Sequence, residues 1–134
     1  MKGNKGVKEL LMPGMNKDEY VTWLKAKTKQ AALTVINLME KTKSSPGINV
    51  VRYQLIKSAT STAANYRAAC RARSKREFYA KICIVVEEAD ETQFWLEVLR
   101  DSDLRVDKER INEQYEEWTE IVRIVTSAKH KSSP

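Results

Sequence analysis

Five positive side chains lie within ten residues near the middle of the chain, and they are the residues with the clearest chemical potential. This basic connection, residues 67–76, contains no acidic residue. It could contact the phosphates of a nucleic acid, and each neutralised phosphate would make the binding more sensitive to salt. It could equally pair with acidic residues of a neighbouring subunit, an interpretation favoured because no aromatic side chains interleave the charges. The five residues are Arg67, Arg71, Arg73, Lys75 and Arg76.

The acidic residues that follow could pair with the basic connection or bind a metal ion. They are Glu87, Glu88, Asp90 and Glu91. Metal sites inside helical bundles combine such carboxylates with Glu-x-x-His pairs, but His130 is the only histidine. We therefore expect these acids to face a neighbouring subunit, together with the aromatic side chains just beyond them. The predicted interface comprises Glu87, Glu88, Glu91, Phe94 and Trp95.

The remaining reactive side chains do not combine into a catalytic or metal site. Cys70, Cys83 and His130 are too few for a four-ligand zinc site, and no Ser-His-Asp set forms without His130. We expect no cofactor, no metal and no enzymatic activity. Two cysteines do not make a disulfide framework, and no apolar run is long enough to span a membrane. These features predict a cytoplasmic protein with no membrane partner.

Charge is divided unevenly along the 134 residues. The net charge of +6 combines an excess of Lys and Arg in residues 1–81 with an excess of Asp and Glu in residues 82–134. Such asymmetry can indicate a nucleic-acid face on the basic half. It can also mean that the two halves attract each other, within one bundle or between subunits, and we favour this second interpretation.

The third expected helix, residues 74–100, carries the basic and acidic groups and has the clearest pattern. Ser74 and Glu77 predict a capping box, in which each side chain accepts a hydrogen bond from the backbone N–H of the other. Behind this start, apolar or small residues recur with alternating spacings of four and three, which predicts one buried row on a helix. The row comprises Phe78, Ile82, Val85, Ala89, Thr92, Leu96 and Leu99.

Three further amphipathic segments predict helices at about residues 17–43, 48–70 and 107–128. With the third helix they predict an all-α, antiparallel up-down-up-down four-helix bundle over residues 17–129. The segments 1–16 and 130–134 are expected to be a flexible leader and a disordered tail. The expected buried row of the first helix is Tyr20, Leu24, Lys27, Ala31, Thr34 and Leu38, and that of the last is Ile111, Tyr115, Trp118, Val122 and Val125.

The second helix ends in a run of small residues, which would let a neighbouring backbone approach closely. Asn65 follows this run on the same row as Ser58 and Thr62. We therefore expect Asn65 to be buried, with hydrogen-bond partners for its amide.

Residues 54–78 resemble the signature of the four-helix-bundle proteins encoded in intervening sequences of bacterial 23S ribosomal RNA genes. Gln54-Leu55 opens the match, Ser61 and Asn65 hold their positions in the pattern, and residues 73–78 (Arg-Ser-Lys-Arg-Glu-Phe) close it. Residues 91–96 (Glu-Thr-Gln-Phe-Trp-Leu) resemble a second segment of the family. The resemblance implies that Ser61 and Asn65 form a buried polar motif.

The resemblance also implies self-association, because relatives form pentameric rings, and it implies no established enzymatic activity. Related accessory proteins of diversity-generating retroelements form pentamers whose basic surface binds a reverse transcriptase and nucleic acid. We therefore expect a homo-oligomer, with a pentamer as the implied size, that acts as an interaction or scaffold protein. The alternative is an accessory factor that binds RNA, DNA or a nucleic-acid enzyme through the basic connection.

Overall fold

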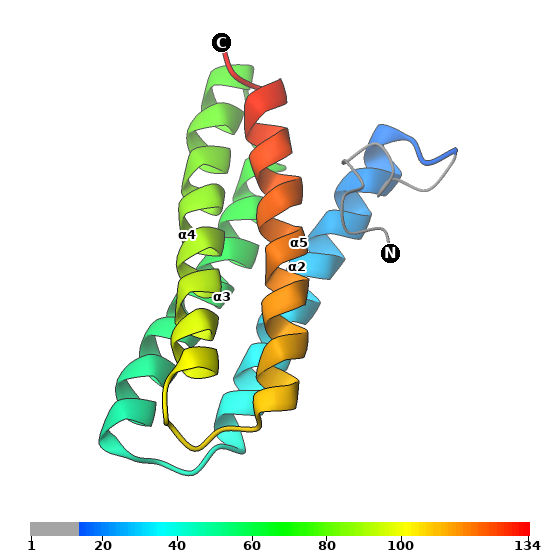
Figure 1. Ribbon diagram of the computed structural model, residues 1–134. Coiled ribbons are helices and arrows are strands. Elements are labelled where there is room, and N and C mark those ends of the chain that lie inside the picture. The colour runs from blue at the N-terminus through cyan, green and yellow to red at the C-terminus, as the bar shows by residue number, and fades with distance from the viewer. Residues whose placement is uncertain (1–13) are drawn as a thin grey trace.

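The computed structural model describes residues 14–134, which form four α-helices and no strand. These are α2 (Lys17–Glu40), α3 (Pro46–Ala69), α4 (Lys75–Asp101) and α5 (Lys108–Lys131). Each helix packs against the next, and α2 also contacts α5, so the four form an up-down-up-down bundle (Figure 1). The predicted fold class is confirmed. Within residues 14–134, no helix combines the length and apolar character that a membrane span requires.

Side-chain caps at the start of each helix explain where the helices begin. The Asn16 side chain accepts a hydrogen bond from the Glu19 N–H at 2.9 Å, and the Glu19 carboxylate accepts one from the Asn16 N–H at 2.8 Å. Ser45 caps α3, and Pro46 fits the first helical position because its missing N–H would have no partner there. Asp107 caps α5 in the same way. Asx and Ser caps of this kind satisfy backbone donors that the helix itself leaves free.

The helices differ from the predicted bounds by two residues or more at three places. α3 begins at Pro46 rather than at residue 48, within the segment predicted as a turn. α2 ends at Glu40 rather than at residue 43. α5 continues to Lys131, so the expectation of a disordered tail from residue 130 is wrong for the first two residues. Cations are stabilised at a helix C-terminus, which explains why the basic end of α5 stays helical. Most of the predicted leader, residues 1–13, lies outside the described residues.

The buried row of α4 is predicted almost completely. Six of its seven members are buried, and Phe78, at the start of the helix, is half-buried. α5 buries Ile111, Trp118 and Val125 as expected. The other two members of its predicted row, Tyr115 and Val122, are only half-buried. Ile121 and Ile124, which were not in the predicted row, are buried. The core is continuous across all four helices.

The predicted row of α2 faces the core, but only two of its six members are fully buried. Leu24 and Ala31 are buried, whereas Lys27 is half-buried. A helix has 3.6 residues per turn rather than 3.5, so the buried side drifts relative to a strict seven-residue repeat. The other buried residues of this helix are Thr28, Ala32, Val35 and Met39.

Small side chains bring α3 and α4 together in the middle of the bundle. The buried Thr92 hydroxyl donates to the Ser58 hydroxyl across the two helices at 2.9 Å. Asn65 is half-buried rather than buried, and its amide does have partners, because it donates to the Ser61 carbonyl at 2.9 Å and to the Ser61 hydroxyl at 3.0 Å. The larger Tyr66, which is 2% exposed, occupies the buried position instead. The predicted Ser61–Asn65 motif is therefore a local contact on the surface of α3.

Two cations close the helix connections at the end of the bundle opposite the basic connection. Arg52 on α3 donates to the carbonyls of Met39 and Thr42, at the end of α2. Lys108 at the start of α5 donates to the carbonyls of Leu99 and Arg100 at 2.7 and 3.0 Å and to that of Ser102 at 2.7 Å. These bonds satisfy carbonyls that α2 and α4 leave unpaired at their ends.

Replacing Lys108 by methionine is expected to lower the free energy of unfolding by about 1–2 kcal/mol. The change keeps most of the apolar stem but removes all three charge-assisted hydrogen bonds to the end of α4. Urea unfolding at a fixed protein concentration measures the loss. Lys129→Met, on the same helix, is the matched control and should change stability by less than about 0.5 kcal/mol. Equal effects of the two changes would show that Lys108 does not anchor the connection.

Candidate functional site

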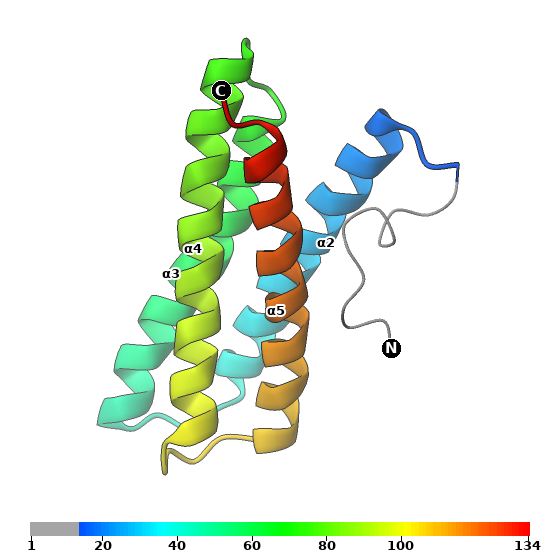
Figure 2. The same cartoon turned by 45° about the horizontal axis from the view of Figure 1, so that its top comes forward.

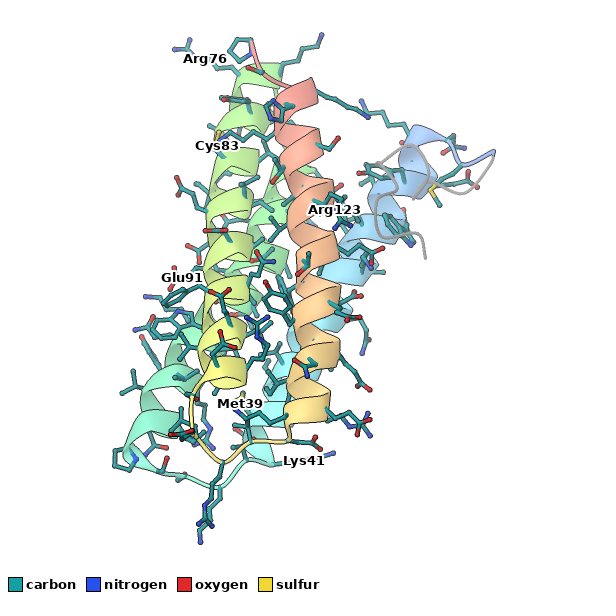
Figure 3. All side chains as sticks on the ribbon, in the orientation of Figure 1. Met39, Lys41, Arg76, Cys83, Glu91 and Arg123 are labelled. Carbon is teal, nitrogen blue, oxygen red and sulfur yellow. The ribbon has the colours of Figure 1, made fainter. Side chains whose placement is uncertain are left out.

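The basic connection lies at the end of the bundle where the C-terminus of the chain also lies (Figure 3). Arg67 is in the last turn of α3, and Lys75 and Arg76 are in the first turn of α4. All five predicted side chains are exposed. The connection thus presents its charges to solvent at one end of the molecule.

Ser74 and Glu77 organise the start of α4. The Ser74 Oγ accepts a hydrogen bond from the Glu77 N–H at 3.0 Å, which is the first half of the predicted capping box. The second half differs, because Glu77 Oε1 accepts from the Arg73 N–H at 3.1 Å rather than from Ser74. This backbone hydrogen bond holds the pKa of the Glu77 carboxyl below its usual value. The Arg73 Nε also lies 3.4 Å from Glu77 Oε1, so this carboxylate fixes the backbone just before the helix.

Cations from both ends of the described chain join the basic connection, and the sequence analysis missed this. Lys17 of α2 and Lys131 of α5 line the same cavity as Arg73, Lys75 and Arg76. The cavity has a volume of about 1040 Å³ and lies between the first turn of α2 and the ends of the other three helices. The sequence did contain a signal for Lys131: basic residues at the end of the last amphipathic segment indicate the C-terminus of a helix.

The acidic residues of α4 lie too far along the helix to neutralise the connection within one chain. Glu87 follows Arg76 by eleven positions, or about 16 Å at 1.5 Å per residue. Within residues 14–134, the only salt bridge of the basic connection is the one between Arg73 and Glu77. Any pairing between these arginines and Glu87, Glu88, Asp90 or Glu91 would need a second subunit.

A second surface, the outer α3–α4 face, concentrates exposed apolar side chains. Four of the five large hydrophobic residues that are exposed in residues 14–134 lie on α3 and α4. They are Val50 (59% exposed), Tyr53 (63%), Ile84 (38%) and Phe94 (49%), whereas Leu33 of α2 is the fifth. We define the face by these four residues together with Lys57, Glu88, Glu91 and Trp95. Patches of this kind on soluble domains mark protein interfaces more often than scattered single residues do.

The predicted interface residues of α4 form part of this face. The rings of Phe94 and Trp95 meet edge to face with centroids 4.9 Å apart. The Trp95 Nε1–H donates to Glu91 Oε2 at 3.1 Å, and Glu91 projects away from the bundle on the side of α4 away from α5 (Figure 3). Trp95 is half-buried, and Glu87 is exposed about two turns before it on the helix. The sequence did not single out Val50 and Tyr53, because neither residue breaks the apolar pattern of α3.

Charge on the outer α3–α4 face is carried mainly by α4. Burial, reinforced by the charges of Glu91 and Glu87, raises the pKa of the Glu88 carboxyl, and Lys57 of α3 acts in the opposite direction. Lys57 also lies over the Tyr53 ring, 5.9 Å from its centroid. The face therefore combines aromatic surface with carboxylates that have few cations nearby, which suits contact with a basic surface.

Lys27 ties α2 to α5 halfway along the bundle. Its Nζ donates to Glu120 at 2.7 Å and to Glu117 at 3.0 Å. Burial lowers the pKa of Lys27, but the hydrogen bonds to Glu120 and Glu117 outweigh it, so the pKa is raised overall. The N-terminal part of α2 diverges from the other helices (Figures 1 and 2), although Leu24 is still buried in the core. The divergence leaves the cavity at the basic end.

The reactive side chains near the cavity are not activated for catalysis. Burial raises the pKa of the Cys70 thiol above its ordinary value, so the nucleophilic thiolate is disfavoured at neutral pH. Burial also raises the pKa of the Tyr66 hydroxyl, which contacts Cys70. Across residues 14–134, no group of three His, Cys, Asp or Glu side chains is placed to hold a metal ion.

The fold and the sequence match known proteins over most of the chain. A protein of unknown function from the S23 ribosomal protein family of Bacteroides thetaiotaomicron, known from a crystal structure, has 30% sequence identity to this chain. The two structures align with a TM-score of 0.70. The match covers 79% of this chain and 97% of that one. The comparison with curated proteins gives no match. Residues 19–127 match the family described as 23S rRNA-intervening sequence protein. The chain therefore belongs to the 23S rRNA-intervening sequence protein family.

Proposed function

We propose that this chain is a non-enzymatic, cytoplasmic interaction protein that works as a homo-oligomer. The observation that carries the proposal is the outer α3–α4 face, where four of the five exposed large hydrophobic side chains of residues 14–134 gather. A single bundle does not need these side chains for its own core. The face carries the carboxylates of Glu88 and Glu91 against the single cation Lys57, whereas the basic connection is cationic, so the two surfaces of different copies are complementary in charge. Five copies is the size that the family resemblance implies.

The charge pattern supports a pairing in which the basic connection of one copy meets α4 of the next. Arg71 and Arg76 have no salt bridge within residues 14–134, and Glu88 lies close to other carboxylates. In a ring, the unpaired arginines of one copy would meet the crowded carboxylates on α4 of the next copy, and both charge imbalances would be relieved. Electrostatic pairing of this kind fixes the orientation of subunits more than it adds affinity.

The proposal predicts a solution mass several times that of the 15.4 kDa chain, with five copies as the expected number. Light scattering coupled to gel filtration measures it. Changing Arg71, Arg73 and Arg76 to Ala should lower the assembled fraction at micromolar concentration, because the cations that orient the contact are lost. Changing Lys41 and Lys43 to Ala, at the opposite end of the bundle, is the matched control. A native protein that remains monomeric at high concentration would rule out the proposed assembly.

A second candidate function is nucleic-acid binding by the basic end, and one observation favours it. Cations from α2, the basic connection and α5 surround one cavity, and within residues 14–134 only Arg73 among them has an acidic partner. Unpaired cations of one sign attract polyanions, and the attraction weakens steeply as salt rises. The same Arg71, Arg73 and Arg76 variant separates the two functions. Loss of nucleic-acid binding with the assembly intact would assign these arginines to phosphates.

A further inference from the structure

The cavity at the basic end is large, and apolar side chains and cations line it together. It has a volume of about 1040 Å³, and its lining is mainly apolar. This volume lies just above the range of about 300–1,000 Å³ that is usual for sites holding one small molecule. The cavity lies where the N-terminal part of α2 diverges from the bundle (Figure 2). Its occupant must therefore suit an apolar interior and a cationic edge together.

Aromatic rings from two helices line the interior of the cavity. Tyr20 comes from α2, and Phe78 and Tyr79 come from the first turn of α4. All three are only half-buried, so part of each ring is available to a ligand. Tyr66 also lines the cavity but is 2% exposed and belongs to the core. Exposed faces of this kind provide stacking surfaces for flat aromatic groups.

The cations around the cavity come from three helices and one turn. Lys17, Arg73, Lys75, Arg76 and Lys131 come from the start of α2, the turn after α3, the start of α4 and the end of α5. A single phosphate would be held by a convergent cluster, whereas several phosphates along a strand need separated cations. The origin of these cations in four separate elements therefore favours a polymer with repeated negative charge over a mononucleotide.

We propose that this cavity binds a short stretch of single-stranded nucleic acid, with bases stacked on Tyr20, Phe78 and Tyr79 and backbone phosphates along the cationic edge. The inference rests on the second candidate function, that the basic end binds nucleic acid, and specifies which form it takes. Single-strand sites combine a basic groove with aromatic stacking surfaces. A duplex keeps its bases stacked inside and could contact only the edge.

The test measures fluorescence anisotropy of labelled twelve-nucleotide strands with the full chain. Oligo(dT), oligo(U) and a duplex of the same length are titrated at low and moderate salt. Both single strands should bind at least tenfold more tightly than the duplex. Tyr79→Leu should weaken single-strand binding by about fivefold or more while leaving duplex binding unchanged, because leucine fills the space but cannot stack in the same way. Tyr20→Leu should act similarly and serves if Tyr79→Leu does not fold.

The cavity at the opposite end of the bundle provides the control. It has a volume of about 640 Å³ and is lined by Lys41, Lys43, Arg105 and Arg110 but by no aromatic residue. Changing Lys41 and Lys43 to Gln should lower the salt-dependent affinity for single strands by less than twofold. If this change weakened single-strand binding more than Tyr79→Leu does, the strand would bind at the end of the bundle opposite the basic connection, and the inference would be overturned.

Other outcomes separate this inference from the function on which it rests. Equal affinity for duplex and single strands, with no effect of Tyr79→Leu, would overturn stacking in the cavity but keep nucleic-acid binding. No binding to any strand at low salt would overturn both. Competition by adenosine monophosphate at the same concentration as the strand would assign the cavity to a small molecule. Competition by poly-glutamate at equal charge would assign it to an acidic protein segment, and either result contradicts the inference.

Discussion

Changing Trp118 to alanine is expected to lower the free energy of unfolding by about 3–5 kcal/mol, a loss large enough to unfold a protein of ordinary stability. Trp118 is fully buried and is the largest of the fully buried side chains in the core. Its removal would leave a cavity between helices that cannot close over it. Urea unfolding followed by circular dichroism, at a fixed protein concentration, measures the loss.

Trp118→Phe is the matched control, because it keeps an aromatic ring in the core. The Trp118 Nε1–H is buried and has no hydrogen-bond partner within residues 14–134. Its loss removes an unpaired donor, which offsets part of the lost packing. We expect a cost below about 2 kcal/mol. A phenylalanine variant as unstable as the alanine variant would show that ring volume does not explain the effect.

Changing both Tyr53 and Phe94 to glutamate is expected to convert the proposed oligomer into monomers. The change places two carboxylates on the outer α3–α4 face, where Glu88 and Glu91 already lie. Contact through this face would then lose two aromatic side chains and would have to desolvate two carboxylates in their place, which costs several kcal/mol. Gel filtration with light scattering should give the mass of a single 15.4 kDa chain.

Leu33→Glu provides the control for this change. Leu33 is the remaining exposed large hydrophobic residue within residues 14–134, is 40% exposed, and lies on α2. The assembly should survive this substitution. Circular dichroism should show that the Tyr53 and Phe94 variant keeps its helical content, since both side chains are exposed. If Leu33→Glu dissociates the oligomer and the double variant does not, the interface lies on α2 instead.

The helices and the buried side of α4 were accessible from sequence because their causes are local. Ser74 begins α4 through a hydrogen bond within its own first turn, and the regular spacing from Ile82 to Leu99 places those residues on one side. The prediction for α2 was less successful because its buried side depends on which neighbours cover it. Lys27 is half-buried only because Glu117 and Glu120, about 90 positions later, meet its ammonium group.

Asn65 shows the limit of a pattern that treats all small polar residues alike. Both Asn65 and Tyr66 follow the small-residue run, and the sequence favoured the asparagine for burial. In the structure Tyr66 is buried and Asn65 bonds to Ser61 on its own helix. Burial of the larger ring removes more apolar surface from water, whereas the amide finds partners at the surface without a desolvation cost.

The sequence by itself determined the four helices, the Ser74 cap of α4 and the cationic character of residues 67–76, because neighbouring residues supply the physical causes. Only the tertiary structure decided that Lys17 and Lys131 join this cluster, that α2 diverges to open a cavity beside it, and that Val50 and Tyr53 share a face with Phe94. These juxtapositions depend on the direction of each helix in space, which is set by packing between residues far apart in the chain.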